Sequence, residues 1–345
     1  MLGWVGLVII SFGIFGVWFL LFSFWGFKEE GNVDRLIASA VGATAQIILV
    51  EILLGHLGFL TLGGVLLIHF FFSGILLGGL FFRGLIPLRN FAVPFKQVGK
   101  DIPTWWERTK GWENGILMGL TLLLILWLGV AAYLFPPRGM DDVYHLPPVY
   151  QYYQDHRISI LPLDLRPQFA YPQNAELLFL WFLIFVGDVR VVDMVQLFLI
   201  FLGCLAIYSL ATRLGSPPRV ALFVSLLFSF SPVVVGQAGS AYVDLIISVY
   251  FLSALALAVG FWQTGRFASF YMVGLVAGLL VGMKYSMVFL VLGIQPLVLY
   301  PLWKGLGFEG TRPALIYILL FIIGGSYWYL RNLMVLGSFL GPSVS

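Results

Sequence analysis

The sequence predicts an all-α membrane protein that crosses the bilayer about ten times. Of its 345 residues, 60% are hydrophobic and only 10% carry a charge, whereas about a quarter of the residues in a soluble domain are charged. Apolar runs of about 20 residues, the length that a membrane-spanning helix needs, recur along the whole chain. The net charge of +3 comes without a basic tract, so nucleic acid is not an expected partner. The single cysteine, Cys204, excludes an intramolecular disulfide and a cysteine-based metal site.

Ten apolar runs are candidate spans. They cover residues 3–26, 36–55, 59–82, 115–135, 190–212, 219–236, 243–263, 267–283, 286–303 and 313–333. The first run begins without the basic and cleavable segments of a signal peptide, so we interpret it as a membrane anchor.

A further apolar segment, 175–186, decides the topology. Its length of about 12 residues is too short to span and is typical of an interfacial or re-entrant helix. If it does not span, 13 of the 19 lysines and arginines share one side, which the positive-inside rule identifies as cytoplasmic. If segment 175–186 spans, the basic residues between 213 and 312 lie on the opposite side of the membrane from those between 83 and 110, and the positive-inside rule is broken. We therefore predict that 175–186 lies against the outer leaflet and that 136–188 form an external loop.

Six cations and eight carboxylates are expected on the external side of the membrane. The six cations are Arg138, Arg157, Arg166, Arg190, Lys284 and Arg331, and the eight carboxylates are Asp141, Asp142, Asp155, Asp164, Glu176, Asp188, Asp193 and Asp244. Cations on this disfavoured side need a local reason. They bind an anionic ligand or pair with the carboxylates, and the sequence leaves both explanations open.

The chain divides into three parts. Residues 1–82 form an N-terminal segment of three spans, and residues 115–345 form a second membrane module. Between them, residues 83–114 form a cytoplasmic amphipathic linker, whose Lys, Arg and Trp suit a membrane surface with anionic headgroups. No internal repeat is evident, which disfavours an inverted-repeat transporter.

A series of motifs runs through the second module. The external loop opens with Asp141-Asp142 and "VYHLPPVYQYYQDHRI", and it continues to "YPQNAELLFLWFLIFVGD". Next come "IYSLATRLGSPPRVALF", "SPVVVGQAGSAYVDL", "GLVAGLLVGMKYSMVFLV" and "YWYLRNLMVLGSFLGPS". In their order and spacing these segments resemble the GT-C superfamily of membrane glycosyltransferases. The resemblance covers about residues 115–345 and is closest to bacterial multispan enzymes related to the protein O-mannosyltransferases and aminoarabinose transferases.

The resemblance implies an inverting glycosyltransferase in a bacterial inner membrane. Such an enzyme moves a hexose or pentose from a polyprenyl-phosphate donor to a lipid, glycan or protein acceptor on the periplasmic face. Residues 1–82 have no counterpart in the family, and a truncated C-terminus is one explanation of the stop after Ser345. Two other classes stay open: a non-catalytic subunit or scaffold that binds lipid and other membrane subunits, and a transporter. A transporter would favour charged residues near the bilayer centre.

Asp141 or Asp142 is the expected general base, and the resemblance favours Asp141. Transfer to a hydroxyl needs a group that takes its proton and a positive charge that stabilises the leaving phosphate. A solvated loop or a helix cap is the alternative reading of the pair. Asp244, at the start of a predicted helix, is expected to orient the acceptor or to bind Mg²⁺ or Mn²⁺ together with the acidic pair. A helix N-cap is the alternative.

Four residues near the outer membrane surface are expected to bind the donor. Lys284 interrupts a long apolar stretch and Arg331 ends a helix, so both are placed to hold the donor's phosphate. Snorkelling to lipid and ordinary interfacial anchoring are the alternatives. The resemblance adds the neighbours Tyr285 and Asn332 to this substrate-binding set.

Two further residues in the loop are substrate-binding candidates. His145 is a candidate to orient the base, contact the sugar or bind a metal, and a loop histidine with none of these roles is the alternative. Tyr144, like Tyr150, Tyr152 and Tyr153, suits either stacking on a sugar or an aromatic belt at the membrane surface.

Overall fold

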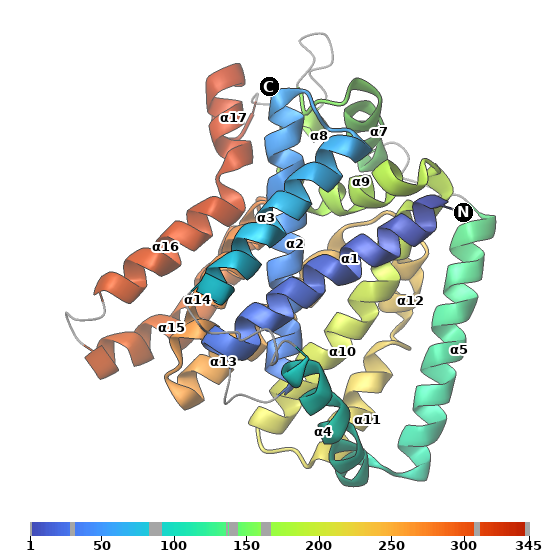
Figure 1. Cartoon of the computed structure of the whole chain (residues 1–345), viewed down its shortest axis with the longest axis vertical. Coiled ribbons are helices and arrows are strands. Elements are labelled where there is room, and N and C mark those ends of the chain that lie inside the picture. Colours follow the sequence, from blue (N-terminus) through green and yellow to red (C-terminus); the bar gives the residue numbers. More distant parts are fainter. Residues whose placement is uncertain are drawn as a thin grey trace.

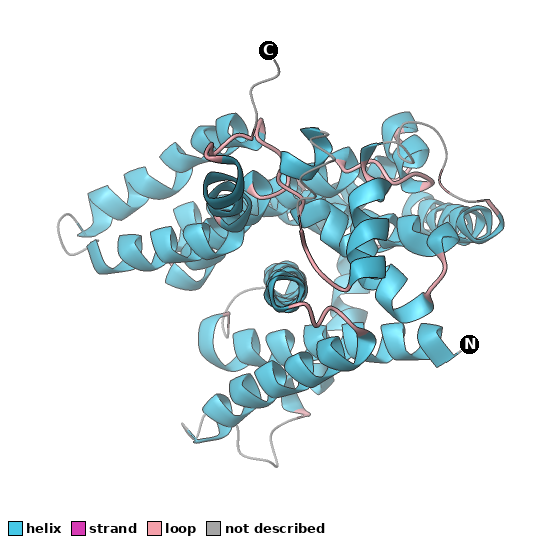
Figure 2. Cartoon of the chain, turned by 90° about the horizontal axis from the view of Figure 1, so that it is seen from above, coloured by secondary structure: helices cyan, strands magenta, loops and turns pink. Residues whose placement is uncertain are grey.

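The computed structural model describes residues 2–27, 32–82, 92–135, 137, 144–159, 167–306 and 311–341. All the regular elements of this part of the chain are helices (Figure 1). A second view shows them as a bundle joined by turns and loops (Figure 2). Helices satisfy their own backbone hydrogen bonds, which is what a chain surrounded by hydrocarbon requires. The prediction of an all-α protein is confirmed for the described residues.

The helices follow one another in this order. The N-terminal part and the linker form α1 (Leu2–Leu21), the π-helical turn η1 (Phe22–Gly26), α2 (Asn32–Leu57), α3 (Leu62–Phe82) and α4 (Val93–Thr109). The second module begins with α5 (Trp112–Leu134), α7 (Leu146–Asp155), α8 (Pro167–Ala170), α9 (Asn174–Val186), the 3₁₀ helix η3 (Val189–Met194) and α10 (Val195–Arg213). It continues with α11 (Pro218–Phe228), α12 (Pro232–Ala238), α13 (Asp244–Thr264), α14 (Phe267–Val281), α15 (Met287–Leu306), α16 (Thr311–Gly325) and α17 (Tyr327–Leu336).

The described residues contain seven helices that are long and apolar enough to cross a membrane, or nine if each bent pair counts as one span. One bent pair is α11 with α12, at an angle of 53°, and the other is α16 with α17, at 57°. Pro232 opens α12, and a proline at this position cannot continue the hydrogen bonds of the preceding helix. These helices support a multi-pass membrane protein, but they do not confirm the predicted number of ten spans.

The predicted span 267–283 forms a shorter helix, α14. Its 15 residues rise about 22 Å, less than the roughly 30 Å of a bilayer core. Two glycines let α16 approach closely. A Cβ at Gly278 would lie 2.2 Å from the carbonyl oxygen of Phe321, and one at Gly274 would lie 2.8 Å from that of Tyr317. Small residues at such contacts are typical of helix packing in membranes. This apolar stretch is therefore buried by neighbouring helices.

Helix α9 is as short as predicted, but it lies inside the protein. Its residues from 174 to 185 are all buried. Helix α1 crosses it so closely that a Cβ at Gly3 would lie 2.2 Å from the carbonyl oxygen of Phe185. The Trp181 indole also donates to Ser11 Oγ at 3.0 Å. An interfacial helix keeps one apolar face in lipid, so this burial favours the re-entrant alternative. The position of α9 relative to the outer leaflet stays a prediction. The N-terminal helices α1 and α2 cover α9 together with α7 and η3 of the second module.

Charged residues from distant segments meet at one end of the bundle. Asp34 on α2 pairs with Arg213 on α10, and Glu113 on α5 pairs with Arg219 on α11. Helix α4 lies at this same end, whereas α7 and α8 lie at the opposite end (Figure 1). The grouping agrees with the topology expected from the distribution of basic residues. Which end faces the cytoplasm stays a prediction.

Candidate active site

A cavity of about 510 Å³, here called the site cavity, lies beside the start of α7. Its lining comes from the start of α7, the segment before α9, the start of α13 and the turn between α14 and α15. The lining residues are Tyr144, His145, Tyr171, Pro172, Glu176, Tyr242, Val243, Asp244, Met283, Lys284, Tyr285 and Ser286. Five predicted site residues therefore meet in one place: Tyr144, His145, Asp244, Lys284 and Tyr285. Up to 141 positions separate them along the chain.

Asn174 positions one side of this cavity. Its side-chain amide donates to the carbonyl of Gly324 at 2.9 Å, and its Oδ1 accepts from the Trp328 indole at 2.7 Å. Its backbone N–H donates to the carbonyl of Gly282 at 2.9 Å. A Cβ at Gly282 would lie 2.1 Å from the Asn174 amide nitrogen, so only glycine permits this approach. The contacts fix the turn that carries Lys284 against the start of α9.

Lys284 and Asp244 form an ion pair at the cavity. The ammonium lies 3.0 Å from Oδ1 of Asp244, and the side chains are 50% and 52% exposed. Asp244 does not cap its helix, because Val243 occupies the cap position, without a side-chain capping hydrogen bond, and Asp244 is the first residue of α13. The helix-cap alternative for Asp244 is therefore not what the structure shows. An exposed pair of this kind is weak, typically about 0.2–1 kcal/mol, so a stronger anion can compete for the lysine.

His145 and Glu176 form a second, buried pair. His145 Nδ1 lies 2.8 Å from Oε1 of Glu176, and both side chains are buried. The other carboxylate oxygen, Oε2, is buried and has no hydrogen-bond partner among the described residues. Glu176 was not among the predicted site residues. Its signal was a carboxylate at the beginning of an apolar helix, a position where burial needs a reason.

Tyrosine rings line the cavity as an aromatic wall, made of Tyr144, Tyr171, Tyr242 and Tyr285. The ring centroids of Tyr144 and Tyr171 are 6.0 Å apart, and those of Tyr171 and Tyr285 are 5.5 Å apart. The Tyr242 ring lies 6.2 Å from that of His145. Burial raises the pKa of Tyr144 and of Tyr285, so both phenols stay neutral and can donate hydrogen bonds. Tyr171 and Tyr242 were not predicted as site residues, although both stand inside the quoted motifs.

Arg331 and Asn332 lie behind the cavity and do not line it. Arg331 is buried, and its guanidinium donates to the carbonyl of Phe169 at 2.6 Å and to Asn332 Oδ1 at 3.0 Å. Asn332 donates to the carbonyl of Ala170 at 2.6 Å and to the Tyr285 hydroxyl at 3.3 Å. These contacts fix α8 and Tyr285. Direct binding of the donor's phosphate by Arg331 and Asn332 stays a prediction.

The predicted acidic pair, Asp141 and Asp142, lies outside the described residues. Among the described residues, no group of three or more His, Cys, Asp or Glu is arranged to hold a metal ion. Of the three predicted metal ligands only Asp244 is described, and the lysine cation beside it already balances its charge. Binding of Mg²⁺ or Mn²⁺ stays a prediction that the contacts of Asp244 do not support.

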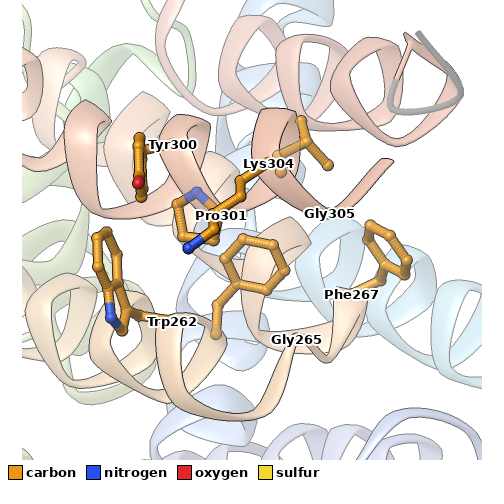
Figure 3. A pocket seen from close by; sticks show the side chains of 9 residues that line it. Trp262, Gly265, Phe267, Tyr300, Pro301, Lys304 and Gly305 are labelled. Atoms are coloured by element: carbon orange, nitrogen blue, oxygen red, sulfur yellow. The ribbon is translucent and has the colours of Figure 1, made fainter. Parts of the chain in front are cut away.

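A second cavity, of about 550 Å³, is lined by the end of α13, the start of α14 and the end of α15 (Figure 3). The rings of Trp262 and Tyr300 stack there with centroids 5.5 Å apart, and Lys304 Nζ lies 5.9 Å from the Tyr300 centroid. Its described lining contains no carboxylate or histidine. It therefore lacks the acid–base groups that the site cavity contains.

No protein-family model matches this sequence, and comparisons with curated proteins and with solved structures give no match.

Proposed function

We propose that this protein is an inverting glycosyltransferase of the GT-C type. It moves a sugar from a polyprenyl-phosphate donor to a hydroxyl of a lipid, glycan or protein acceptor, at the periplasmic face of a bacterial inner membrane. One observation carries the proposal: five residues singled out from separate motifs line the same cavity. A cation, carboxylates, a histidine and tyrosines meet there, and these are the groups that sugar transfer from a phosphate requires.

Lys284 is the group proposed to bind the donor's phosphate. It is half exposed at the cavity, and its partner Asp244 leaves two ammonium protons for another acceptor. When the bond between the sugar and the phosphate breaks, negative charge grows on the leaving oxygen. A fixed cation beside that oxygen lowers the energy of the transition state. The aromatic wall offers apolar faces for the sugar ring and neutral phenols for its hydroxyls.

A non-catalytic scaffold that binds lipid and other membrane subunits is the second candidate. One observation favours it: an apolar cavity of about 500 Å³ lined mainly by α1, α2, α9 and α10. A lipid chain or a partner's helix would suit such a lining. The charged and polar lining of the site cavity has no use in a scaffold, so we prefer the enzyme.

The test uses the purified full chain in lipid nanodiscs. The donors are undecaprenyl phosphate carrying mannose, glucose or arabinose, and the measurement is sugar release to water or to added sugars. Undecaprenyl phosphate alone, the part that all such donors share, serves for binding. Lys284→Met should weaken its binding roughly ten- to a hundred-fold, since a charge-assisted hydrogen bond is typically worth about 1.5–3 kcal/mol.

Lys304→Met is the matched control, because this lysine lies at the second cavity. The Lys304→Met variant should bind undecaprenyl phosphate and turn over donor as the unmodified protein does. Absence of turnover with all three donors, together with equal binding by both lysine variants, would favour the scaffold.

A further inference from the structure

We infer that the His145–Glu176 pair, rather than a carboxylate of the Asp141–Asp142 pair, takes the proton of the attacking hydroxyl. This inference rests on the proposed function and names a residue pair that the sequence motifs do not assign. Glu176 touches His145 and acts through it, so Glu176 is a positioning residue.

The pair is held rigidly at the cavity. Glu176 lies in the first turn of α9, two residues after Asn174, whose side chain is anchored on both sides. His145 directly precedes α7. Helix α7 packs on α9, and the hydroxyl of Tyr152 donates to Gln173 Oε1 at 2.6 Å beneath the pair. A proton acceptor fixed in this way needs little reorganisation when the reaction occurs.

The contact between the two side chains sets the chemistry of the imidazole. With Nδ1–H donated to the carboxylate, Nε2 carries a lone pair and is the atom left to accept a proton. The carboxylate also stabilises the imidazolium that forms after the transfer. The same arrangement of histidine and carboxylate activates hydroxyl nucleophiles in hydrolases of unrelated folds.

The unpartnered oxygen of Glu176 is the second observation. A buried carboxylate oxygen without a hydrogen bond costs stability, typically by more than the gain from one ordinary bond. A second hydroxyl of a sugar or acceptor in the cavity would satisfy it. The structural alternative, in which the pair only joins α7 to α9, gives this oxygen no function.

The proposed step balances as follows. The acceptor hydroxyl oxygen bonds to the anomeric carbon of the donor, and the bond from that carbon to the phosphate oxygen breaks. The bonding electrons leave with the phosphate, which Lys284 holds. The hydroxyl proton moves to Nε2 of His145 and is later released to water, so polyprenyl phosphate and the glycosylated acceptor are the products.

Several titratable groups surround His145. Glu176 faces it from α9, Tyr144 adjoins it, and Tyr242 faces it from the segment before α13. The Asp244–Lys284 pair lies in the same cavity. Among the described residues, Glu176 is the carboxylate in direct contact with the imidazole.

The test measures donor turnover against pH in nanodiscs for His145→Gln, Glu176→Gln and the control His56→Gln, whose histidine is exposed on α2. We expect a wild-type rate that falls at low pH, since a general base must be unprotonated to accept the proton of the hydroxyl. In His145→Gln, turnover should fall about 10²–10⁴-fold. The decrease of the rate at low pH, here called the acid limb, should disappear, while undecaprenyl phosphate still binds. Glu176→Gln should lower kcat more than it changes the KM for the donor, because the imidazole loses the carboxylate that orients it. His56→Gln should match the wild type in both rate and profile.

Two results separate this inference from the proposed function. If the wild type turns over none of the three donors, the proposed function and the inference both fail. If it does, an unchanged acid limb in His145→Gln, with Asp141→Asn or Asp142→Asn losing the turnover, overturns the inference alone and returns the role of base to the acidic pair. Preserved undecaprenyl phosphate binding in each variant shows that the protein remains folded.

Discussion

The ammonium of Lys284 lies 3.0 Å from Oδ1 of Asp244, although 40 positions separate the two residues in the chain. The pair is half exposed, so it is weak enough to open when an anion enters the cavity. A lysine held in this way is kept at the cavity rather than extended toward lipid headgroups. This contact makes the snorkelling explanation of Lys284 less attractive than the binding one.

Removing the carboxylate should strengthen phosphate binding. In Asp244→Asn, Lys284 loses its competitor, and an approaching phosphate no longer meets a negative charge. An exposed pair is typically worth about 0.2–1 kcal/mol, so the Kd for undecaprenyl phosphate should fall by up to about fivefold. Asp155→Asn, on the exposed end of α7, is the control and should leave the Kd unchanged. Weaker binding by Asp244→Asn would instead show that this carboxylate holds the ligand, as a shared cation would require.

Arg331 should act on stability. Arg331→Met keeps an apolar side chain of similar length but removes the donors to Phe169 and Asn332. Each acceptor left buried without a partner typically costs about 1–3 kcal/mol, so the unfolding midpoint in detergent should fall. Arg190→Met is the control, because Arg190 binds Asp188 at a half-exposed position and its loss should matter less. Full stability of Arg331→Met with lost undecaprenyl phosphate binding would restore the phosphate-binding role.

The close contact of α14 with α16 should depend on Gly278. In Gly278→Ala the new Cβ would lie 2.2 Å from the carbonyl oxygen of Phe321, and backbone cannot yield as a flexible side chain does. Overpacking of this kind typically costs about 1–3 kcal/mol. Gly293→Ala, where no atom lies within 4 Å of the new Cβ, should leave the unfolding midpoint almost unchanged. Equal midpoints for the two variants would contradict the packing described for α14.

The predicted topology can be tested by cysteine labelling in intact cells. In a Cys204→Ser background, a membrane-impermeant maleimide should label Gln154→Cys on α7. It should label Lys100→Cys on α4 only after the membrane is opened. Both positions are exposed on the protein, so access to the reagent is the variable that differs. Labelling of Lys100→Cys from outside would reverse the assignment of the two ends.

Composition and hydrophobic length determined the fold class and the approximate positions of most helices. A membrane-spanning helix forms from its own apolar side chains and its own backbone hydrogen bonds, so its signal is local. The same local signal failed for α14 and for the surroundings of α9. An apolar side chain buried against another helix and one facing lipid have the same hydrophobicity, and only tertiary contacts distinguish them.

The residues of the candidate site also divide into those that the sequence indicates and those that only helix packing reveals. The sequence singled out Asp244 and Lys284 because charges at the ends of apolar runs are costly and therefore informative. It could not show that His145 meets Glu176, since that contact depends on how α7 packs on α9. Nor could it show that Arg331 is turned toward the carbonyl of Phe169 and away from the cavity. Residue types and their depth in the membrane follow from the chain itself. Which of them share a cavity is decided by helix packing, because a hydrogen bond needs atoms within about 3 Å and sequence spacing does not determine such distances between helices.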